Sequence, residues 1–69
     1  MKSYLVKTNH GFYSREDDFE SALKSDDEWI LDELKDCENE GYALENMNRS
    51  FVKHKDANYI VTTLIFSKQ

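Results

Sequence analysis

The chain has 69 residues, with nine Lys and Arg against fourteen Asp and Glu, no proline and one cysteine. This length allows one small domain. No stretch reaches the roughly 20 apolar residues of a membrane span, and one cysteine cannot form an internal disulfide. Nine aromatic residues argue against disorder, and the start of the chain lacks the pattern of a signal peptide. We therefore expect a single cytoplasmic domain over residues 1–69.

The formal net charge of −5 is unevenly distributed along the chain. Residues 14–41 carry a net charge of −9, whereas residues 1–13 and residues 42–69 each carry +2. A field of this kind repels nucleic-acid phosphates and attracts a basic protein surface. A second interpretation stays open, in which the acids form a solvated helical face that keeps a small protein soluble.

The first predicted elements are a strand and a turn. Residues 4–8 are rich in strand-forming side chains. Gly11 supplies the conformational freedom that a turn over residues 9–11 needs. Residues 12–13 then form a short return strand.

Two helices are predicted after this turn. Ser14 has the position of an N-cap before an acidic first turn. Ser25 and Glu28 have the spacing of a capping box at the start of a second helix, and Gly41 stands where a C′ glycine ends a helix. One kinked helix is the alternative. Asp26 stands where a continuous apolar stripe needs a hydrophobic residue, and this favours a break.

The C-terminal part of the chain predicts strands. Residues 42–47 alternate in polarity, with an interruption near residues 46–48, and residues 51–54 continue this strand or begin another. Residues 55–58 predict a turn. Residues 59–66 give the strongest strand signal, because both faces are apolar or β-branched. This pattern is typical of a central strand whose far face is also covered.

The predicted architecture is a small two-layer α+β domain. It has a three- to four-stranded antiparallel sheet with helices on one face, in the order β-(β)-α-α-β-β. One helical layer covers only one face of the sheet, so the face that carries Tyr59, Val61 and Ile65 is either exposed or covered by a partner. A core of this size contributes only about 3–5 kcal/mol. A homodimer through this face is therefore one expectation.

No residue pattern indicates catalysis, a metal site or a cofactor. Cys37 lies on the apolar side of the second predicted helix between two acids, which suits a small buried side chain better than a nucleophile. His10 and His54 stand apart and do not complete the four ligands of a zinc site. The dense carboxylates lack the alternating ligands and central glycine of a calcium loop. We therefore expect a protein that is not an enzyme and has no metal or cofactor.

A stripe on the second predicted helix is the candidate binding surface. Its members align beside the apolar side of the helix, and a tryptophan among carboxylates resembles an interface anchor. Acids at the helix end oppose the dipole by about 0.3–1 kcal/mol each, so stability alone does not explain them. The stripe and the neighbouring acids give a candidate partner-binding set of Trp29, Glu33, Asp36, Glu40, Asp26 and Asp27. The alternative is that Trp29 covers the edge of the core and the acids only confer solubility.

A second, basic patch is a candidate for binding a phosphate or an acidic partner. It consists of Arg49, Lys53 and Lys55. Lysine side chains on edge strands also guard against aggregation, and this competing interpretation stays open.

The order of the predicted segments resembles a family of very short bacterial and phage proteins of unknown function. These proteins begin with a strand, contain one main helix that ends in Glu-Gly-Trp, and close with a β-hairpin. The matching segments are Tyr4-Leu5-Val6-Lys7, Ile30-Leu31-Asp32-Glu33-Leu34, Glu40-Gly41-Tyr42-Ala43-Leu44 and Tyr59-Ile60-Val61. Tyr42 replaces the usual tryptophan, and the acidic segment over residues 14–28 is longer than in the family. The resemblance implies a fold and no activity.

In size and charge, the chain is also similar to small acidic phage proteins that block host or defence enzymes by occupying a nucleic-acid channel. We therefore expect a non-enzymatic protein-binding module of phage or mobile-element type. Its acidic region would occlude a basic, nucleic-acid-binding site on a larger protein such as a nuclease. We expect no direct contact with nucleic acid or membrane. The alternative is a homo-oligomeric structural domain or a small-ligand-binding domain that uses the apolar sheet face.

Overall fold

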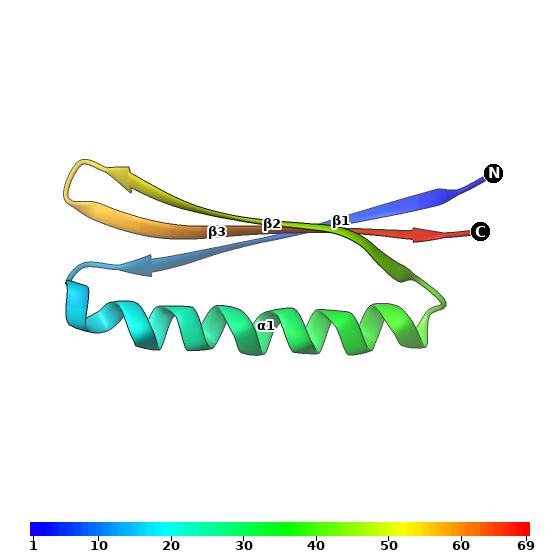
Figure 1. Ribbon diagram of the computed structural model, residues 1–69, viewed down its shortest axis with the longest axis horizontal. Helices are drawn as coiled ribbons and strands as arrows, with labels where there is room; N and C mark the ends of the chain where they lie inside the picture. Colours follow the sequence, from blue (N-terminus) through cyan, green and yellow to red (C-terminus); the bar gives the residue numbers. More distant parts are fainter.

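The computed structural model describes all residues 1–69, and it shows one helix that lies along one face of a three-stranded sheet (Figure 1). The elements in chain order are β1 (Ser3–Tyr13), the short 3-10 turn η1 (Glu16–Asp18), α1 (Phe19–Asn39), β2 (Ala43–His54) and β3 (Ala57–Lys68). The prediction of a small α+β domain with an antiparallel sheet is confirmed. The predictions of two helices and of a second short strand are wrong, because the order is β-α-β-β.

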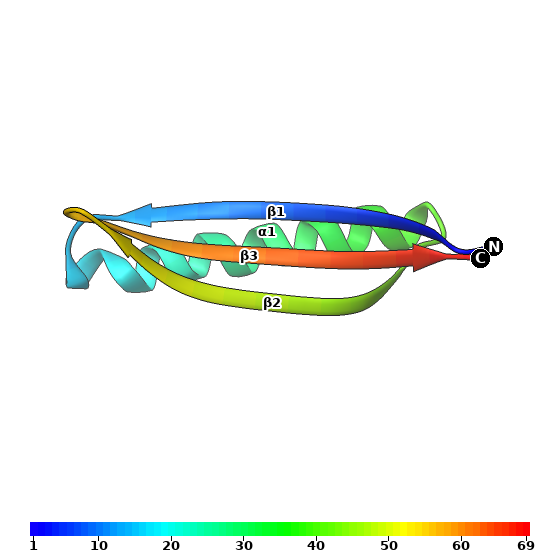
Figure 2. The ribbon, with the colours of Figure 1, turned by 90° about the horizontal axis from the view of Figure 1, so that it is seen from above.

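Strand β3 lies between β1 and β2 and pairs antiparallel with both, so the strand order is β1-β3-β2 (Figure 2). The segment with the strongest strand signal is therefore the central strand, as predicted. Strands β1 and β2 run parallel to each other on either side of it. Helix α1 makes the crossover that two parallel strands of one sheet require.

Strand β1 continues through the predicted turn over residues 9–11. Gly11 pairs with Ile60, and Tyr13, the last residue of the strand, pairs with Asn58. Gly11 does not have a positive φ, so it occupies ordinary strand backbone, and the nearest atoms to a Cβ built there lie 3.8 Å away. The turn prediction was wrong because β3 is long enough to pair with β1 over its full length.

Helix α1 is continuous through the predicted break. Ser25 lies inside the helix, and Ser14 is not a cap, because Arg15 takes the N-cap position of η1 without a side-chain hydrogen bond. The four acids Glu16, Asp17, Asp18 and Glu20 at this end face the positive pole of the helix dipole. The helix therefore starts with favourable charge but without the predicted caps.

The end of α1 is as predicted. Gly41 has φ +88°, its N–H donates to the carbonyl of Glu38 at 3.0 Å, and the Tyr42 N–H donates to the carbonyl of Cys37 at 2.9 Å. These two hydrogen bonds form a Schellman motif. Tyr42 also packs against the core cluster that contains Cys37. Gly41 is thus the residue that turns the chain from the helix into β2.

Strand β2 is one strand and not two. Its register against β3 shifts between Leu44 and Asn46, which identifies a β-bulge at Glu45. The predicted interruption near residues 46–48 was therefore placed too late. A two-residue turn, Lys55 and Asp56, joins β2 to β3.

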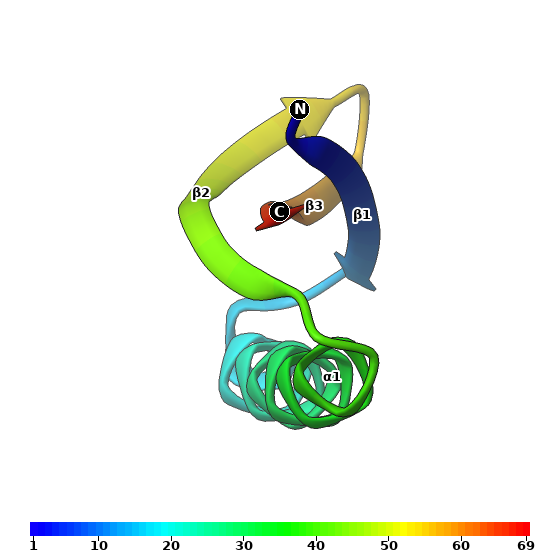
Figure 3. The same cartoon turned by 90° about the vertical axis from the view of Figure 1, so that its right-hand side faces the viewer.

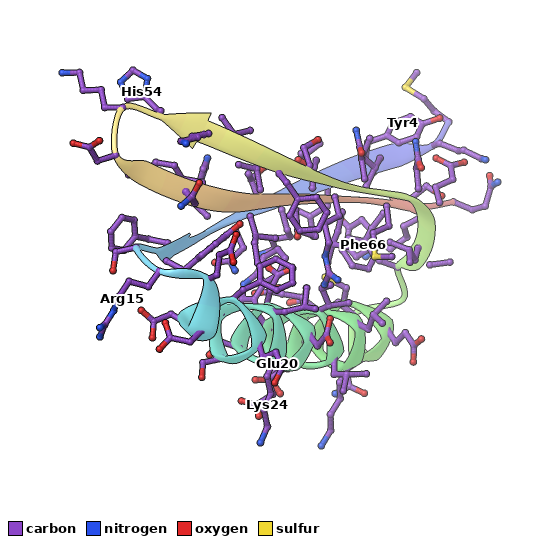
Figure 4. The ribbon with its side chains drawn as sticks, turned by 60° about the vertical axis from the view of Figure 1, so that its left-hand side comes forward. Tyr4, Arg15, Glu20, Lys24, His54 and Phe66 are labelled. Carbon is purple, nitrogen blue, oxygen red and sulfur yellow. The ribbon has the colours of Figure 1, made fainter.

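The core is small and lies between α1 and the central strand. Only seven of the 69 residues are buried, and the apolar ones are Ile30 and Cys37 of α1 with Ile60, Leu64 and Phe66 of β3. Phe66 lies between the two layers in Figure 4. The end-on view in Figure 3 shows a twisted sheet with α1 on one side and no element on the other. The opposite face of the sheet is therefore left open.

Candidate functional site

A buried polar cluster explains why the helix does not break at Asp26. The Asp26 side chain is fully buried. Its carboxylate accepts hydrogen bonds from Asn9 Nδ2 at 2.9 Å and from Thr62 Oγ1 at 2.5 Å, and Arg49 Nη2 lies 2.8 Å from Oδ2. These partners come from β1, β3 and β2, so the carboxylate connects α1 to all three strands. Asp26, a member of the predicted partner-binding set, is thus buried and paired within the folded chain and does not belong to the surface of the helix.

The same cluster removes Arg49 from the predicted basic patch. Arg49 Nη2 also donates to Asp27 Oδ1 at 2.6 Å, while its buried Nε has no hydrogen-bond partner. The hydrogen bond to Asp27 and the charge of Asp26 raise the pKa of the guanidinium, although burial opposes this rise. Lys53 and Lys55 are exposed near the hairpin turn. Arg49 is therefore a structural cation, and Asp27 is tied to it, so only two exposed lysines of the predicted patch remain.

The predicted stripe on the helix is divided between the core and solvent. Trp29 is half-buried and packs against the core cluster. Glu33 faces β1, and its Oε2 lies 3.8 Å from Lys7 Nζ. Asp36 and Glu40 are exposed and form no ion pair. Only the last two residues of the stripe are thus freely available to a partner.

A lysine from a distant part of the chain lies at the acidic C-terminal end of α1. The last turn of the helix contains no basic residue. Lys68, at the end of β3, donates from Nζ to the carbonyl oxygen of Glu40 at 3.2 Å and lies 4.9 Å from the ring centre of Tyr42. This contact supplies part of the positive charge that favours a helix C-terminus. The carboxylates of the same turn remain unpaired.

A row of exposed carboxylates along α1 was not recognised from the sequence. Glu28, Asp32, Asp36 and Glu40 are all exposed, follow one another at intervals of four residues, and form no ion pair with Lys or Arg. Each Cα lies about 6 Å further along the helix axis than the last. We call these four residues the acidic ridge. The i, i+4 spacing alone could have identified the acidic ridge. Because two separate helices were predicted, only the stripe beside the core was considered.

Figure 4 shows the outer side of α1 near its start, where Glu20 and Lys24 point away from the sheet. Lys24 and Lys35 are the only basic residues of α1, and neither lies within 4 Å of a carboxylate oxygen. The outer side of the helical layer is therefore predominantly negative.

The sheet face that α1 does not cover carries no charged residue. It consists of five cross-strand rows, each with one residue from β1, β3 and β2. The rows are Phe12–Tyr59–Val52, His10–Val61–Ser50, Thr8–Thr63–Asn48, Val6–Ile65–Asn46 and Tyr4–Ser67–Ala43. We call these fifteen residues the open face. The predicted Tyr59, Val61 and Ile65 lie together along its central strand.

Several apolar side chains of the open face are strongly exposed. Tyr4, Val6 and Phe12 are 61, 59 and 58% exposed, and Val52 is 45% exposed. The rings of Phe12 and Tyr59 lie 5.7 Å apart as a cross-strand pair. Antiparallel sheets with one solvated face usually alternate between apolar and polar residues. The open face departs from this pattern, because its solvent-facing side chains are either apolar or polar without a charge.

A second apolar surface lies between α1 and β2. An open groove of about 410 Å³ is lined by Asp27, Ile30, Leu31, Met47 and Arg49. Leu31 is 66% exposed and Met47 is 50% exposed. Strand β2 is an edge strand, and the helix covers mainly β1 and β3. Unlike the open face, this groove has charged groups, Asp27 and Arg49, in its lining.

The geometry of the remaining candidate groups gives no reactive centre. Cys37 is 2% exposed, as predicted for a small buried side chain. Burial raises the pKa of its thiol, and the carboxylate of Glu33 adds to this rise. No three His, Cys, Asp or Glu side chains come close enough together to hold a metal ion. The structure has no helix of the length and apolar character that a membrane crossing requires.

Comparison with known proteins adds no family to these observations. No family model, no curated protein and no solved structure matches the chain.

Proposed function

We propose that the chain is a non-enzymatic cytoplasmic protein that binds a basic surface of a larger protein through the acidic ridge of α1. The observation that carries this proposal is the row of four exposed carboxylates, Glu28, Asp32, Asp36 and Glu40, without a single cation partner. Glu28, Asp32 and Asp36 lie on a continuous helix of 21 residues and Glu40 is its C-cap residue, so the spacing of the ridge is set by the helix. Asp36 and Glu40 belong to the predicted set, and Glu28 and Asp32 replace Asp26 and Asp27.

The ridge weakens the helix that carries it. Like charges four residues apart destabilise a helix by about 0.2–0.5 kcal/mol per pair. Asp36 and Glu40 also lie near the negative end of the helix dipole, which disfavours carboxylates. A basic partner surface would neutralise both effects on binding. The arrangement is therefore better suited to a complex than to the isolated protein.

The spacing of the ridge favours a nucleic-acid-binding site as the partner surface. A nucleic-acid strand presents a regular row of negative charges to Lys and Arg side chains, and the ridge presents a similar row on a rigid helix. A protein that fills such a site blocks it by steric exclusion and by charge. We infer an inhibitor of phage or mobile-element type that acts on a nucleic-acid-binding protein such as a nuclease.

A competition experiment tests this function. The tagged protein is immobilised, exposed to a bacterial lysate, and then challenged with a short DNA duplex. We expect the duplex to release the captured proteins, because the ridge and the DNA would occupy the same basic site. A change from about 50 to about 200 mM salt should also release them. Captured proteins that stay bound in the presence of excess duplex would contradict the proposal.

Matched charge variants make the test specific. Asp32→Lys combined with Asp36→Lys reverses the centre of the ridge. Glu16→Lys combined with Asp56→Lys makes the same change in net charge at two exposed acids outside the ridge. We expect the first variant to lose capture and the second to retain it. Equal loss in both variants would show that only net charge matters and that the ridge is not the binding surface.

The second candidate function is a homo-oligomeric domain that uses the apolar face of its sheet. The absence of charge from the open face favours it. The two functions are compatible, because the acidic ridge and the open face share no residue: the ridge residues belong to α1 and its C-cap, and the open face to the three strands.

A further inference from the structure

The open face is assembled from residues that avoid charge in an otherwise highly charged chain. One third of all residues are charged, but none of the fifteen open-face residues is Asp, Glu, Lys or Arg. The charged residues of β1 and β3 are Lys7 and Lys68, and both contact the helical layer. On β2, Arg49 contacts α1 and Glu45 lies in the bulge, where it pairs with Lys2. Lys53, the third charged residue of β2, pairs with Asn58 in a row that points to the helix side of the sheet. The charged side chains of the three strands therefore lie on the helix-facing side of the sheet or at the rim of the open face.

We propose that two copies of the chain pack open face to open face, forming a four-layer dimer with both helices on the outside. This inference rests on the second candidate function and deepens it, since it names a second copy as the partner and fixes the packing as face to face; its test does not depend on the acidic ridge.

A second copy is the occupant that this face fits chemically. In a two-fold symmetric contact, each surface meets itself, so residues of one type come to lie near their own copies. Charged residues would repel one another in such a contact. The polar groups of the open face belong to Thr, Ser, Asn, His and Tyr side chains, and each of them can both donate and accept hydrogen bonds. Every group on the face is therefore compatible with its own copy.

Other occupants fit less well. Nucleic acid requires Lys or Arg contacts to its phosphates, and the open face contains none. The positively charged patches that attract anionic lipid surfaces are also missing. The groove between α1 and β2 is the rival self-association surface, because β2 leaves a free backbone edge. That groove has Asp27 and Arg49 at its border, so a symmetric contact there brings like charges together.

The size of the open face sets an upper limit on the area that a dimer buries. Three strands about 4.8 Å apart, with five rows spaced at two residues, cover about 500 Å² when taken as flat. Two copies then bury at most about 1,000 Å², the lower limit of a specific interface, because the sheet is twisted (Figure 3). Tyr4, Val6 and Phe12 are each more than half exposed in the single copy, so they supply most of the apolar area that becomes buried.

The test measures mass and geometry together. The full-length protein at high micromolar concentration is analysed by sedimentation and by light scattering, and we expect about twice the 8.2 kDa of one chain. A strict monomer at this concentration overturns the proposal. Val6→Lys places a charge on the β1 side of the open face, one row from its middle, and should shift the dissociation constant at least 10-fold towards monomer. Leu31→Lys is the matched control in the α1–β2 groove and should leave the dimer intact.

The separation of the two helices distinguishes the packing modes. A spin label at Lys24→Cys, in a Cys37→Ser background, reports the distance between the outer sides of the two helices. Face-to-face packing stacks four layers about 10 Å apart, so the helices are separated by about 30 Å or more. Pairing of β2 edges places both helices on one side of a six-stranded sheet, about 20 Å apart. The longer distance supports the proposal, and the shorter one overturns it.

The variants are checked for folding by circular dichroism before their masses are compared. If Val6→Lys does not fold, Asn48→Lys provides the same charge at an exposed edge position of the open face. A folded Asn48→Lys protein that remains dimeric would also overturn the proposal.

Discussion

Replacing Asp26 with asparagine should destabilise the protein by about 2 kcal/mol. The substitution keeps the shape of the side chain and removes its charge. Asn9 and Thr62 donate to different oxygens of the carboxylate, whereas the new amide has one acceptor oxygen and one NH2 group. The amide oxygen can keep the hydrogen bond from Asn9 and the NH2 group can donate to the Thr62 hydroxyl, but Arg49 loses its buried carboxylate partner at 2.8 Å. A hydrogen bond to a charged group is worth about 1.5–3 kcal/mol.

The structure sets the expected loss near the middle of this range. Breaking a fully buried ion pair costs about 3–5 kcal/mol. Arg49 is 24% exposed and keeps its contact with Asp27 at 2.6 Å. Its charge therefore still has access to solvent and to one carboxylate partner. The loss is still severe, because a chain of this length has a total stability of roughly 3–10 kcal/mol.

Urea denaturation followed by circular dichroism measures the effect, with wild type and variants compared at the same protein concentration. With a slope of about 1 kcal/mol per M urea for a small domain, the midpoint should fall by about 2 M. Asp27→Asn is the matched control, since Asp27 is 57% exposed and its neutralisation should cost less than about 1 kcal/mol. A midpoint for Asp26→Asn within about 0.5 M of wild type, or an equal loss in both variants, would refute the role assigned to the cluster.

Further predictions concern the glycines and the cysteine. Gly41→Ala should destabilise the protein by about 1 kcal/mol because φ is +88°, whereas Gly11→Ala should be neutral or stabilising. Thermal melting of both variants checks this difference, and equal effects would contradict it. Burial raises the pKa of the Cys37 thiol above its usual value of 9.0, so its contribution to stability is complete below pH 9 and is lost as the pH rises through the folded-state value. The wild type should therefore lose more stability than Cys37→Ala between pH 8 and pH 10.5 in urea titrations, and parallel losses would count against this assignment.

The parts of the fold that the sequence predicted are those specified by nearby residues. The helix ends at Gly41 because a glycine adopts the required backbone angle, and residues 59–66 form the central strand because they are apolar on both faces. The errors arose where residues far apart in the sequence determine the local structure. Asp26 was interpreted as a break because its partners Asn9, Thr62 and Arg49 lie on three strands far apart in the sequence. No local pattern indicates that they would converge on one carboxylate.

The turn assigned around Gly11 has a similar explanation. Glycine favours turns locally, but the long partner strand β3 extends β1 through this residue. The positions of the candidate binding surfaces, too, were predicted only where nearby residues are sufficient to specify them. The sequence located the acids on a helix and placed Tyr59, Val61 and Ile65 on an uncovered face. Which acids are free and how far the uncharged face extends depend on strand register and on ion pairs between elements.

The salt dependence of binding tests the central claim, that the acidic ridge recognises a basic site. Once a captured nucleic-acid-binding protein has been purified, its association rate constant with the chain is measured by stopped flow between about 50 and 200 mM salt. We predict a decrease of at least about 10-fold over this range for the wild type and for Glu16→Lys/Asp56→Lys. Asp32→Lys/Asp36→Lys should associate slowly at every salt concentration. A rate that is independent of salt, or a ridge variant that associates as fast as the wild type, would contradict the account.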